Sequence, residues 1–173
     1  MRIVVIGAGA MGGLFGGKLA AAGNDVLLYD KWSEHVAAIE RLGLSIEGTD
    51  NTVVRYRVRA TDQPPREIAD AELVLVQVKG YDTYESLRPF NGRLSPDTFV
   101  LSLQNGLGNL EQMRQALPAH HRILLGTTAH GATVHLALGK SPWVIWRGAR
   151  RRAPRLRTPA MAARLFPWPI PAR

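Results

Sequence analysis

The glycines near the amino terminus are the residues whose spacing most directly implies chemistry. They form the pattern G-x-G-x-x-G after a short apolar run and before a helix-like stretch. Such a turn seats a dinucleotide pyrophosphate: the first glycine permits a tight turn, the second lets the backbone approach the phosphates, and the third lets helix and strand pack closely. The helix N-terminus adds unpaired N–H groups and partial positive charge. The residues predicted to bind a dinucleotide here are Gly7, Ala8, Gly9, Ala10, Met11 and Gly12.

An acidic residue follows the second apolar run at the spacing typical of a ribose contact. The run is Asp25–Tyr29, and Asp30 comes directly after it. A carboxylate there favours a free ribose 2′-hydroxyl, hence NAD, because it repels a 2′-phosphate, whereas Lys31 can offset that repulsion and pair with the phosphate of NADP. Asp30 can also cap a helix that begins near Ser33. Both Asp30 and Lys31 are therefore predicted coenzyme-binding residues, and the choice of coenzyme stays open at this point.

The same amino-terminal segment also resembles a secretory signal peptide, because an early positive charge precedes an apolar stretch with small residues. Lys18 interrupts that stretch, its glycines weaken a helix, and a second strand-like run follows at once. We therefore favour the dinucleotide interpretation. The chain has no cysteine and no apolar run close to the roughly 20 residues that span a bilayer. We expect a cytoplasmic protein without membrane contact.

Polar side chains follow three further apolar runs. Lys79 follows one of them, and Asn105 and His130 follow the other two. Ligands of open α/β sheets bind beyond the carboxyl ends of the strands, so these side chains are candidates for a shared site. Lys79 can neutralise a carboxylate or phosphate, or lie solvated at a sheet edge. The Asn105 carboxamide can hold a nicotinamide or a substrate carbonyl, although Asn105-Gly106 is also a common turn dipeptide. His130 is a candidate general acid, but a single histidine after a strand is more often structural.

Histidine and cysteine usage gives no indication of a metal site. His120 and His121 are adjacent in an expected loop and have no acidic or cysteine companions at ligand spacing. We predict that they lie at the surface and that the chain binds no metal.

Strand-like and helical patterns alternate along the first 139 residues. Helices are expected over 13–22 and Ser33–Leu42, and a hairpin is expected between 44–47 and 52–58, of which the second strand presents one side to water. Alternation of this kind predicts an α/β fold, a Rossmann-like doubly wound and mainly parallel sheet with a short irregular C-terminal tail. The expected sheet strands are Arg2–Ile6, Asp25–Tyr29, 72–78, 98–103 and 122–128.

The net charge of +8 comes entirely from the C-terminal end of the chain. Residues 1–139 contain 13 Lys/Arg and 14 Asp/Glu, whereas residues 140–173 contain 9 Lys/Arg, no acidic residue and 6 of the 11 prolines. The prolines exclude a helix near the C-terminus. We therefore expect a dinucleotide-binding domain over 1–139 and a basic Pro/Arg-rich tail over 140–173 that is disordered or translated out of frame.

Taken together, the motifs resemble the nucleotide-binding domain of the ketopantoate reductase (2-dehydropantoate 2-reductase) family. The resemblance covers about residues 1–135. In that family NADPH delivers a hydride to the ketone of 2-dehydropantoate, giving pantoate for pantothenate biosynthesis. The resemblance implies that Lys79 and Asn105 lie near the nicotinamide end and that the backbone near Gly131 lines the same cleft. It rests on residues 7–12, Val78-Lys79, the run Gln104-Asn-Gly-Leu-Gly108, and the run Gly126-Thr-Thr-Ala-His130.

The chain departs from the family pattern in two respects. Many members carry a basic residue where Asp30 stands, so NAD is an alternative to NADP. The family also has a second, all-helical domain with the proton-donating lysine and most substrate contacts, which residues 140–173 do not resemble. We do not assign the lysine's role to Lys140, and the catalytic residue is unknown. We therefore expect a truncated enzyme that binds dinucleotide weakly and turns over its small α-keto acid substrate little or not at all.

Other function classes stay open. One is a non-catalytic dinucleotide-binding scaffold or sensor, and another is a different Rossmann dehydrogenase, which would leave Lys79 and Asn105 unexplained. Arginines 150–152 lie among tryptophans and would give non-specific, salt-sensitive affinity for nucleic acid, which we do not expect to be the function. An oligomer is also possible, because a missing second domain would leave apolar surface exposed.

Overall fold

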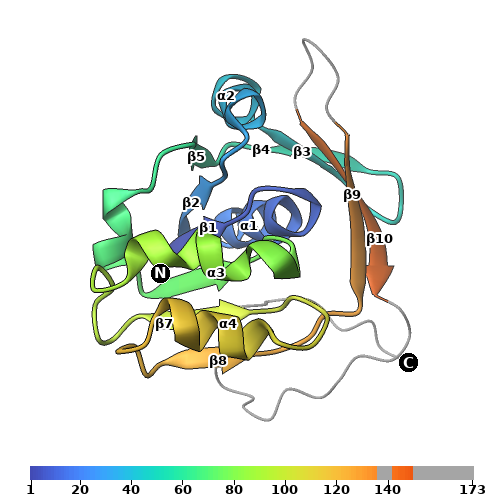
Figure 1. The fold of residues 1–173 in the computed structure, drawn as a ribbon. Coiled ribbons are helices and arrows are strands. Elements are labelled where there is room, and N and C mark those ends of the chain that lie inside the picture. The colour runs from blue at the N-terminus through green and yellow to red at the C-terminus, as the bar shows by residue number, and fades with distance from the viewer. Residues whose placement is uncertain (136–141, 150–173) are drawn as a thin grey trace.

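Six parallel strands form the central sheet of the protein. The structure is a computed structural model that describes residues 1–135 and 142–149 (Figure 1). The strand order β5-β2-β1-β6-β7-β8 runs outward from β1 in both directions, and all neighbours are parallel, as the doubly wound Rossmann-like prediction requires. These strands are β1 (Arg2–Ile6), β2 (Asp25–Tyr29), β5 (Arg59–Thr61), β6 (Leu73–Val76), β7 (Phe99–Ser102) and β8 (Ile123–Leu125).

Helices cover both faces of this sheet (Figure 1). Side chains of a strand alternate between faces, so Ile3 and Val5 of β1 pack with α1 and α2, whereas Val4 and Ile6 pack with α3 and α4. Burial of both faces explains why β1 and β6 are continuous apolar runs. The helices are α1 (Ala10–Ala21), α2 (Ser33–Leu42), α3 (Thr83–Leu87) and α4 (Asn109–Ala116), with short 3-10 turns η1 (Arg66–Asp70), η2 (Gly80–Asp82) and η3 (Arg88–Phe90).

A second sheet lies on the other side of α1 and has the strand order β4-β3-β10-β9. Its β3–β4 pair is the expected antiparallel hairpin, β3 pairs in parallel with β10, and β10 pairs antiparallel with β9. Helix α1 fits between the two sheets because a β-carbon on Gly16 would overlap Leu28, and one on Gly17 would lie 2.7 Å from Ile46 Cδ1. The strands are β3 (Leu44–Glu47), β4 (Val53–Tyr56), β9 (His130–His135) and β10 (Trp143–Ala149).

Strand β10 lies beyond the domain boundary that we expected at residue 139. Val144 of this strand is fully buried, and its Cγ2 atom lies 3.2 Å from where a β-carbon on Gly13 would stand. Residues 143–149, which we expected to be part of the tail, form β10, which pairs along β3 and β9. Lys140 and residues 150–173, for which we expected disorder or an out-of-frame sequence, lie outside the described residues.

Most elements lie where the apolar runs predict them. The bounds of β1, β2, β3 and α2 are as expected, whereas α1 begins at Ala10, three residues early, because the glycine turn leads directly into the helix. Strands β6, β7 and β8 are shorter than the apolar runs that contain them. Val53 and Val54 of β4 are 49% and 41% exposed. Both sides of β4, at the edge of its sheet, therefore meet solvent, where we expected only one to do so.

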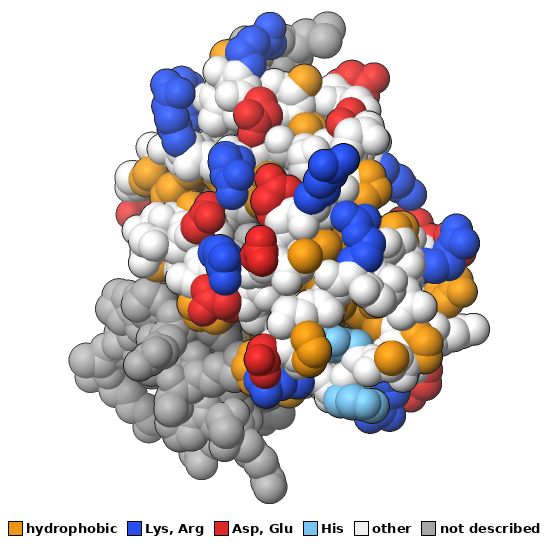
Figure 2. All heavy atoms as spheres, turned by 90° about the vertical axis from the view of Figure 1, so that its left-hand side faces the viewer, with side chains coloured by type: hydrophobic (Ala, Val, Ile, Leu, Met, Phe, Trp, Pro, Cys, Tyr) orange, Lys and Arg blue, Asp and Glu red, His pale blue; other side chains and the backbone are white. Residues whose placement is uncertain are grey.

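The surface of the described residues carries charges of both signs. Basic and acidic side chains are interspersed on the face drawn in Figure 2. Among the helices of residues 1–135 and 142–149, none has the length and apolar character needed to cross a membrane.

Candidate coenzyme-binding site

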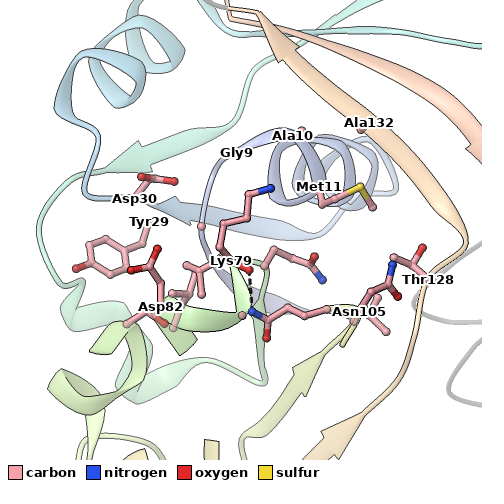
Figure 3. Close-up of a pocket in the computed structure, with 18 of the residues that line it drawn as sticks. Gly9, Ala10, Met11, Tyr29, Asp30, Lys79, Asp82, Asn105, Thr128 and Ala132 are labelled. Atoms are coloured by element: carbon pink, nitrogen blue, oxygen red, sulfur yellow. Dashed lines mark hydrogen bonds between the residues drawn. The ribbon is translucent and has the colours of Figure 1, made fainter. Parts of the chain in front are cut away.

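A pocket of about 520 Å³ opens beyond the carboxyl ends of the central strands (Figure 3). It lies where ligands of doubly wound sheets bind, at the point from which strand order runs in opposite directions. Eight of the eleven predicted binding residues line it. They are Gly7, Gly9, Ala10, Met11, Asp30, Lys31, Lys79 and Asn105, whereas Ala8, Gly12 and Gly131 are not among its lining residues.

The glycines of the turn differ in what surrounds them. Gly7 has a φ of 95°, and a β-carbon there would lie 2.8 Å from the Val78 nitrogen. A β-carbon on Gly12 would overlap the carbonyl oxygen of Gly7. Gly9 differs, because a β-carbon there would meet nothing within 4 Å, so its backbone borders open space in the pocket. Gly7 and Gly12 thus shape the turn, and Gly9 leaves room for a ligand.

The N-terminus of α1 is directed at this open space. Gly9 is the N-cap residue and provides no side chain to accept hydrogen bonds from the first helical N–H groups. The first turn of an α-helix leaves such groups without intrahelical partners, and they carry partial positive charge. A phosphate above Gly9 would accept hydrogen bonds from them.

Ala8 lies behind the turn rather than in the pocket and is fixed by two side chains. Its N–H group donates to Asp30 Oδ2 at 2.7 Å, and its carbonyl oxygen accepts from His35 Nε2 at 2.8 Å. His35 is fully buried in α2 and stacks on Trp32 with ring centroids 5.0 Å apart. We did not predict His35 as a site residue. Its position one turn before Ile39 on the apolar face of α2 was the available signal, because a buried polar side chain needs a partner.

Asp30 accepts hydrogen bonds from two backbone N–H groups. It does not cap α2, so the capping interpretation was wrong. Oδ2 accepts from Ala8, and Oδ1 accepts from the Trp32 N–H at 3.0 Å, whereas the N-cap residue of α2 is Trp32 itself, with no side-chain cap. A carboxylate has about four acceptor positions, so these bonds leave capacity on both oxygens. Its neighbour Lys31 forms an ion pair with Asp82, at 3.3 Å between Nζ and Oδ1.

The end of β6 contributes Lys79 and a second donor that the motifs did not identify. Lys79 precedes η2, and its side chain extends toward Gly9 and Ala10 (Figure 3). Gln77 also lines the pocket, and its Nε2 group is buried without a hydrogen-bond partner. A buried amide group without a partner is destabilising unless a ligand or water completes it. Gln77 is therefore a candidate ligand contact, and its polar side chain at the end of a buried strand was the signal that we missed.

The residue before Asn105, Gln104, is fixed by side-chain hydrogen bonds. Gln104 Nε2 donates to the Val78 carbonyl oxygen at 2.7 Å and to Thr83 Oγ1 at 2.9 Å, so it joins the end of β7 to the end of β6. The following turn needs glycine, because Gly106 has a φ of 109°. The turn interpretation of Asn105-Gly106 and the binding interpretation are therefore compatible.

His130 lines the pocket, whereas Gly131 does not. The indole N–H of Trp146 donates to His130 Nδ1 at 3.0 Å, which requires a neutral ring protonated at Nε2. Burial also lowers the pKa of His130 below its ordinary value of 6.5, and both observations disfavour a cationic acid. Gly131 is turned away, and a β-carbon there would lie 3.6 Å from Arg147 Cβ. Its neighbours His130 and Ala132 line the cleft instead.

The residues described form no group of three or more potential metal ligands. Of the two histidines expected at the surface, His121 is exposed, and His120 is partly buried with its Nε2 atom 2.8 Å from the Thr98 carbonyl oxygen.

The groups that line the pocket match the chemistry of a dinucleotide pyrophosphate. Open space above Gly9 faces the start of α1, which suits an anion, and Gln77 Nε2 provides a donor that lacks a partner. Lys79 and Asn105 line the same pocket and add a cation and a carboxamide.

Comparison with known proteins agrees with this geometry. Residues 3–147 match the family model described as ketopantoate reductase PanE/ApbA. The chain is 45% identical over 134 residues to the 2-dehydropantoate 2-reductase of Halobacterium salinarum, covering 76% of this chain and 43% of the relative. It is 38% identical over 149 residues to that of Pyrococcus horikoshii, covering 86% and 45%. The chain thus spans less than half the length of the curated relatives it matches.

Solved structures give the same result. A PanE/ApbA family ketopantoate reductase from Ralstonia eutropha aligns with a TM-score of 0.67 and 33% identity, over 86% of this chain and 47% of the other. D-mandelate dehydrogenase in a ternary structure with NADH and anilino(oxo)acetate aligns with a TM-score of 0.73 and 30% identity, over 86% and 46%. The family match covers most of the chain and includes the glycine turn, Lys79, Asn105 and the first five residues of β10. The chain belongs to the ketopantoate reductase PanE/ApbA family.

Proposed function

We propose that this chain forms the coenzyme-binding part of a reductase that converts a 2-keto acid, in the first instance 2-dehydropantoate, to the 2-hydroxy acid. The observation that carries the proposal is the convergence of the glycine turn, Lys79 and Asn105 on one pocket. Three separate segments of the sequence meet there at the carboxyl ends of β1, β6 and β7.

Each group has a specific task in such a reaction. A bound reduced nicotinamide coenzyme supplies a hydride to the ketone carbon. The α1 N-terminus and the backbone at Gly9 bind the pyrophosphate, and Gln77 Nε2 completes its hydrogen bonding on the coenzyme. The positive charge of Lys79 stabilises the carboxylate of the keto acid and the alkoxide that forms at its ketone during hydride transfer. Asn105 can donate to a carbonyl oxygen and accept from an amide.

The proton that converts the alkoxide to a hydroxyl is assigned to no described residue. His130 faces the pocket as a neutral ring whose Nδ1 accepts from Trp146. Its lowered pKa makes it a poor source of a proton at neutral pH.

The coenzyme class is a nicotinamide dinucleotide. The family resemblance implies NADPH, and Asp30 provides a reason for NADH, the coenzyme bound in the D-mandelate dehydrogenase structure. The choice depends on the residues around the adenosine ribose.

Calorimetric titration of the full chain with NADPH and NADH tests the proposal. Gly9→Ala places a methyl group in the open space above the turn at a backbone φ of −64°, which alanine adopts without strain. We expect the affinity for either coenzyme to fall about tenfold or more, with unchanged thermal stability. Gly131→Ala is the matched control, because its methyl group points toward Arg147 and away from the pocket. Absence of binding by the wild-type chain, or equal losses in both variants, would refute the proposal.

A further inference from the structure

We infer that this chain selects NADH over NADPH through an Asp30 carboxylate that two backbone amides hold in place. Asp30 lies at the side of the pocket where Tyr29 and Asp82 also lie (Figure 3), which we call the ribose end. The inference rests on the proposed function, because it concerns which dinucleotide the same pocket accepts.

The orientation of Asp30 is fixed by its hydrogen bonds. Oδ2 accepts from the Ala8 N–H at 2.7 Å and Oδ1 accepts from the Trp32 N–H at 3.0 Å, so the carboxylate cannot rotate out of the pocket without breaking both. Its remaining lone pairs can accept hydrogen bonds from ribose hydroxyls. In NADPH a 2′-phosphate replaces the 2′-hydroxyl, and its negative charge repels the Asp30 carboxylate.

Lys31 lines the pocket next to Asp30 in the chain and is the candidate to neutralise a 2′-phosphate, but it already has a partner. Its Nζ atom lies 3.3 Å from Asp82 Oδ1, and its side chain is 80% exposed. Such exposed pairs are weak, so the lysine can move. If it turned to a phosphate, however, Asp82 would be left as an unpaired anion on the same pocket wall.

Among the residues that the structure describes, the other groups at this end of the pocket provide no additional cation. Tyr29 lies between Asp30 and Asp82 (Figure 3), and burial, followed by the nearby Asp30 charge, raises the pKa of its phenol, so the ring is neutral. Glu85 also lines the pocket and pairs with Arg88 at 3.2 Å. Lys79, the second lysine among the lining residues, extends toward the glycine turn. The ribose end is thus lined by more acidic than basic side chains.

The experiment measures dissociation constants of the full-length chain for NADH and NADPH by calorimetry. We expect the wild type to bind NADH about tenfold or more tightly than NADPH. Adenosine diphosphate and its 2′-phosphorylated analogue serve as further probes and should differ in the same direction, because the discrimination lies at the adenosine end. Asp30→Asn should weaken NADH and strengthen NADPH, so that the ratio approaches one.

Two further variants separate this mechanism from general electrostatics. Asp82→Asn releases Lys31 while Asp30 stays in place, and should strengthen NADPH binding with little effect on NADH. Asp97→Asn removes a carboxylate that is 83% exposed and paired with Arg122, outside the pocket, and should leave the ratio unchanged.

The outcomes are distinct. Wild-type binding of NADPH as tightly as NADH overturns the inference and leaves the proposed function intact. An effect of Asp97→Asn equal to that of Asp30→Asn also overturns it, because net charge would then explain the ratio. Binding of neither coenzyme refutes the proposed function and the inference together. If Asp30→Asn fails to fold, the wild-type ratio and Asp82→Asn still decide the question.

Discussion

His35 Nε2 donates a hydrogen bond of 2.8 Å to the carbonyl oxygen of Ala8, 27 residues earlier in the chain. The second helix therefore supports the glycine turn through a side chain that does not line the pocket. Asp30 holds the N–H group of the same alanine, so both polar groups of Ala8 are bound by side chains. The turn is organised before any ligand arrives, which lowers the entropic cost of binding one.

This relationship predicts the effect of replacing His35. His35→Leu keeps the apolar volume but leaves the buried Ala8 carbonyl oxygen without its donor, and should cost about 1–3 kcal/mol of unfolding free energy and weaken coenzyme binding. His35→Gln retains a donor near the Nε2 position and should restore much of both. Urea denaturation and coenzyme titration check these expectations. Equal behaviour of the two variants would show that the hydrogen bond is irrelevant.

Replacement of Gln77 should not lower the stability of the protein, unlike replacement of His35, because the buried Nε2 group of Gln77 has no hydrogen-bond partner in the protein. Gln77→Leu removes an unsatisfied polar group, so we expect equal or greater stability together with coenzyme affinity reduced about three- to tenfold. Gln115→Leu, on the exposed surface of α4, is the control for the added apolar side chain. Unchanged affinity of the Gln77 variant would exclude a coenzyme contact.

His130 predicts a specific dependence of stability on pH. Burial lowers the folded-state pKa of this histidine below 6.5, so the unfolded chain takes up the proton first as the pH falls. Its contribution to stability is complete above pH 6.5 and is lost as the pH falls from that value through the lower folded-state pKa. His130→Asn, which retains an acceptor for the Trp146 indole, should abolish this part of the dependence. The difference between the two proteins in urea denaturation at pH 7.5 and pH 5 measures it, and parallel pH profiles would contradict the prediction.

Replacement of Val144 tests whether β10 packs on α1 in solution. Its side chain is fully buried against α1, so Val144→Ala should reduce the free energy of unfolding by about 1–3 kcal/mol. Val54→Ala, at a site 41% exposed on β4, should change it by less than about 0.5 kcal/mol. Similar effects of the two substitutions in chemical denaturation would mean that β10 does not cover α1 in solution.

The sequence predicted the elements whose signal is local. Continuous apolar runs identified β1 and β2, and an apolar periodicity identified α2 with its observed bounds. The rule that ligands lie beyond strand ends brought Lys79 and Asn105 to one pocket, although they are 26 residues apart. Each of these inferences needed only a segment and its immediate neighbours.

The features that we missed depend on partners distant in the chain. Strand β5 has three residues and no apolar run, and it exists because β2 offers an edge to Arg59–Thr61. Strand β10 lies in a basic segment, and its pairing with β3 across about 100 residues determines its place. The roles of His35 and Gln77 likewise follow from what surrounds them after folding.

Helix α1 is enclosed by strands on two sides while its first turn faces the pocket, and this has a thermodynamic consequence. A ligand that binds the first turn of α1 stabilises the helix against local unfolding. Because α1 packs on both sheets, the ligand should also slow local opening of the sheet that it does not contact. Amide hydrogens of Leu44–Glu47 should therefore exchange more slowly once coenzyme is present, although no residue of that strand lines the pocket. Hydrogen exchange in the four-stranded sheet would then reveal whether coenzyme is bound.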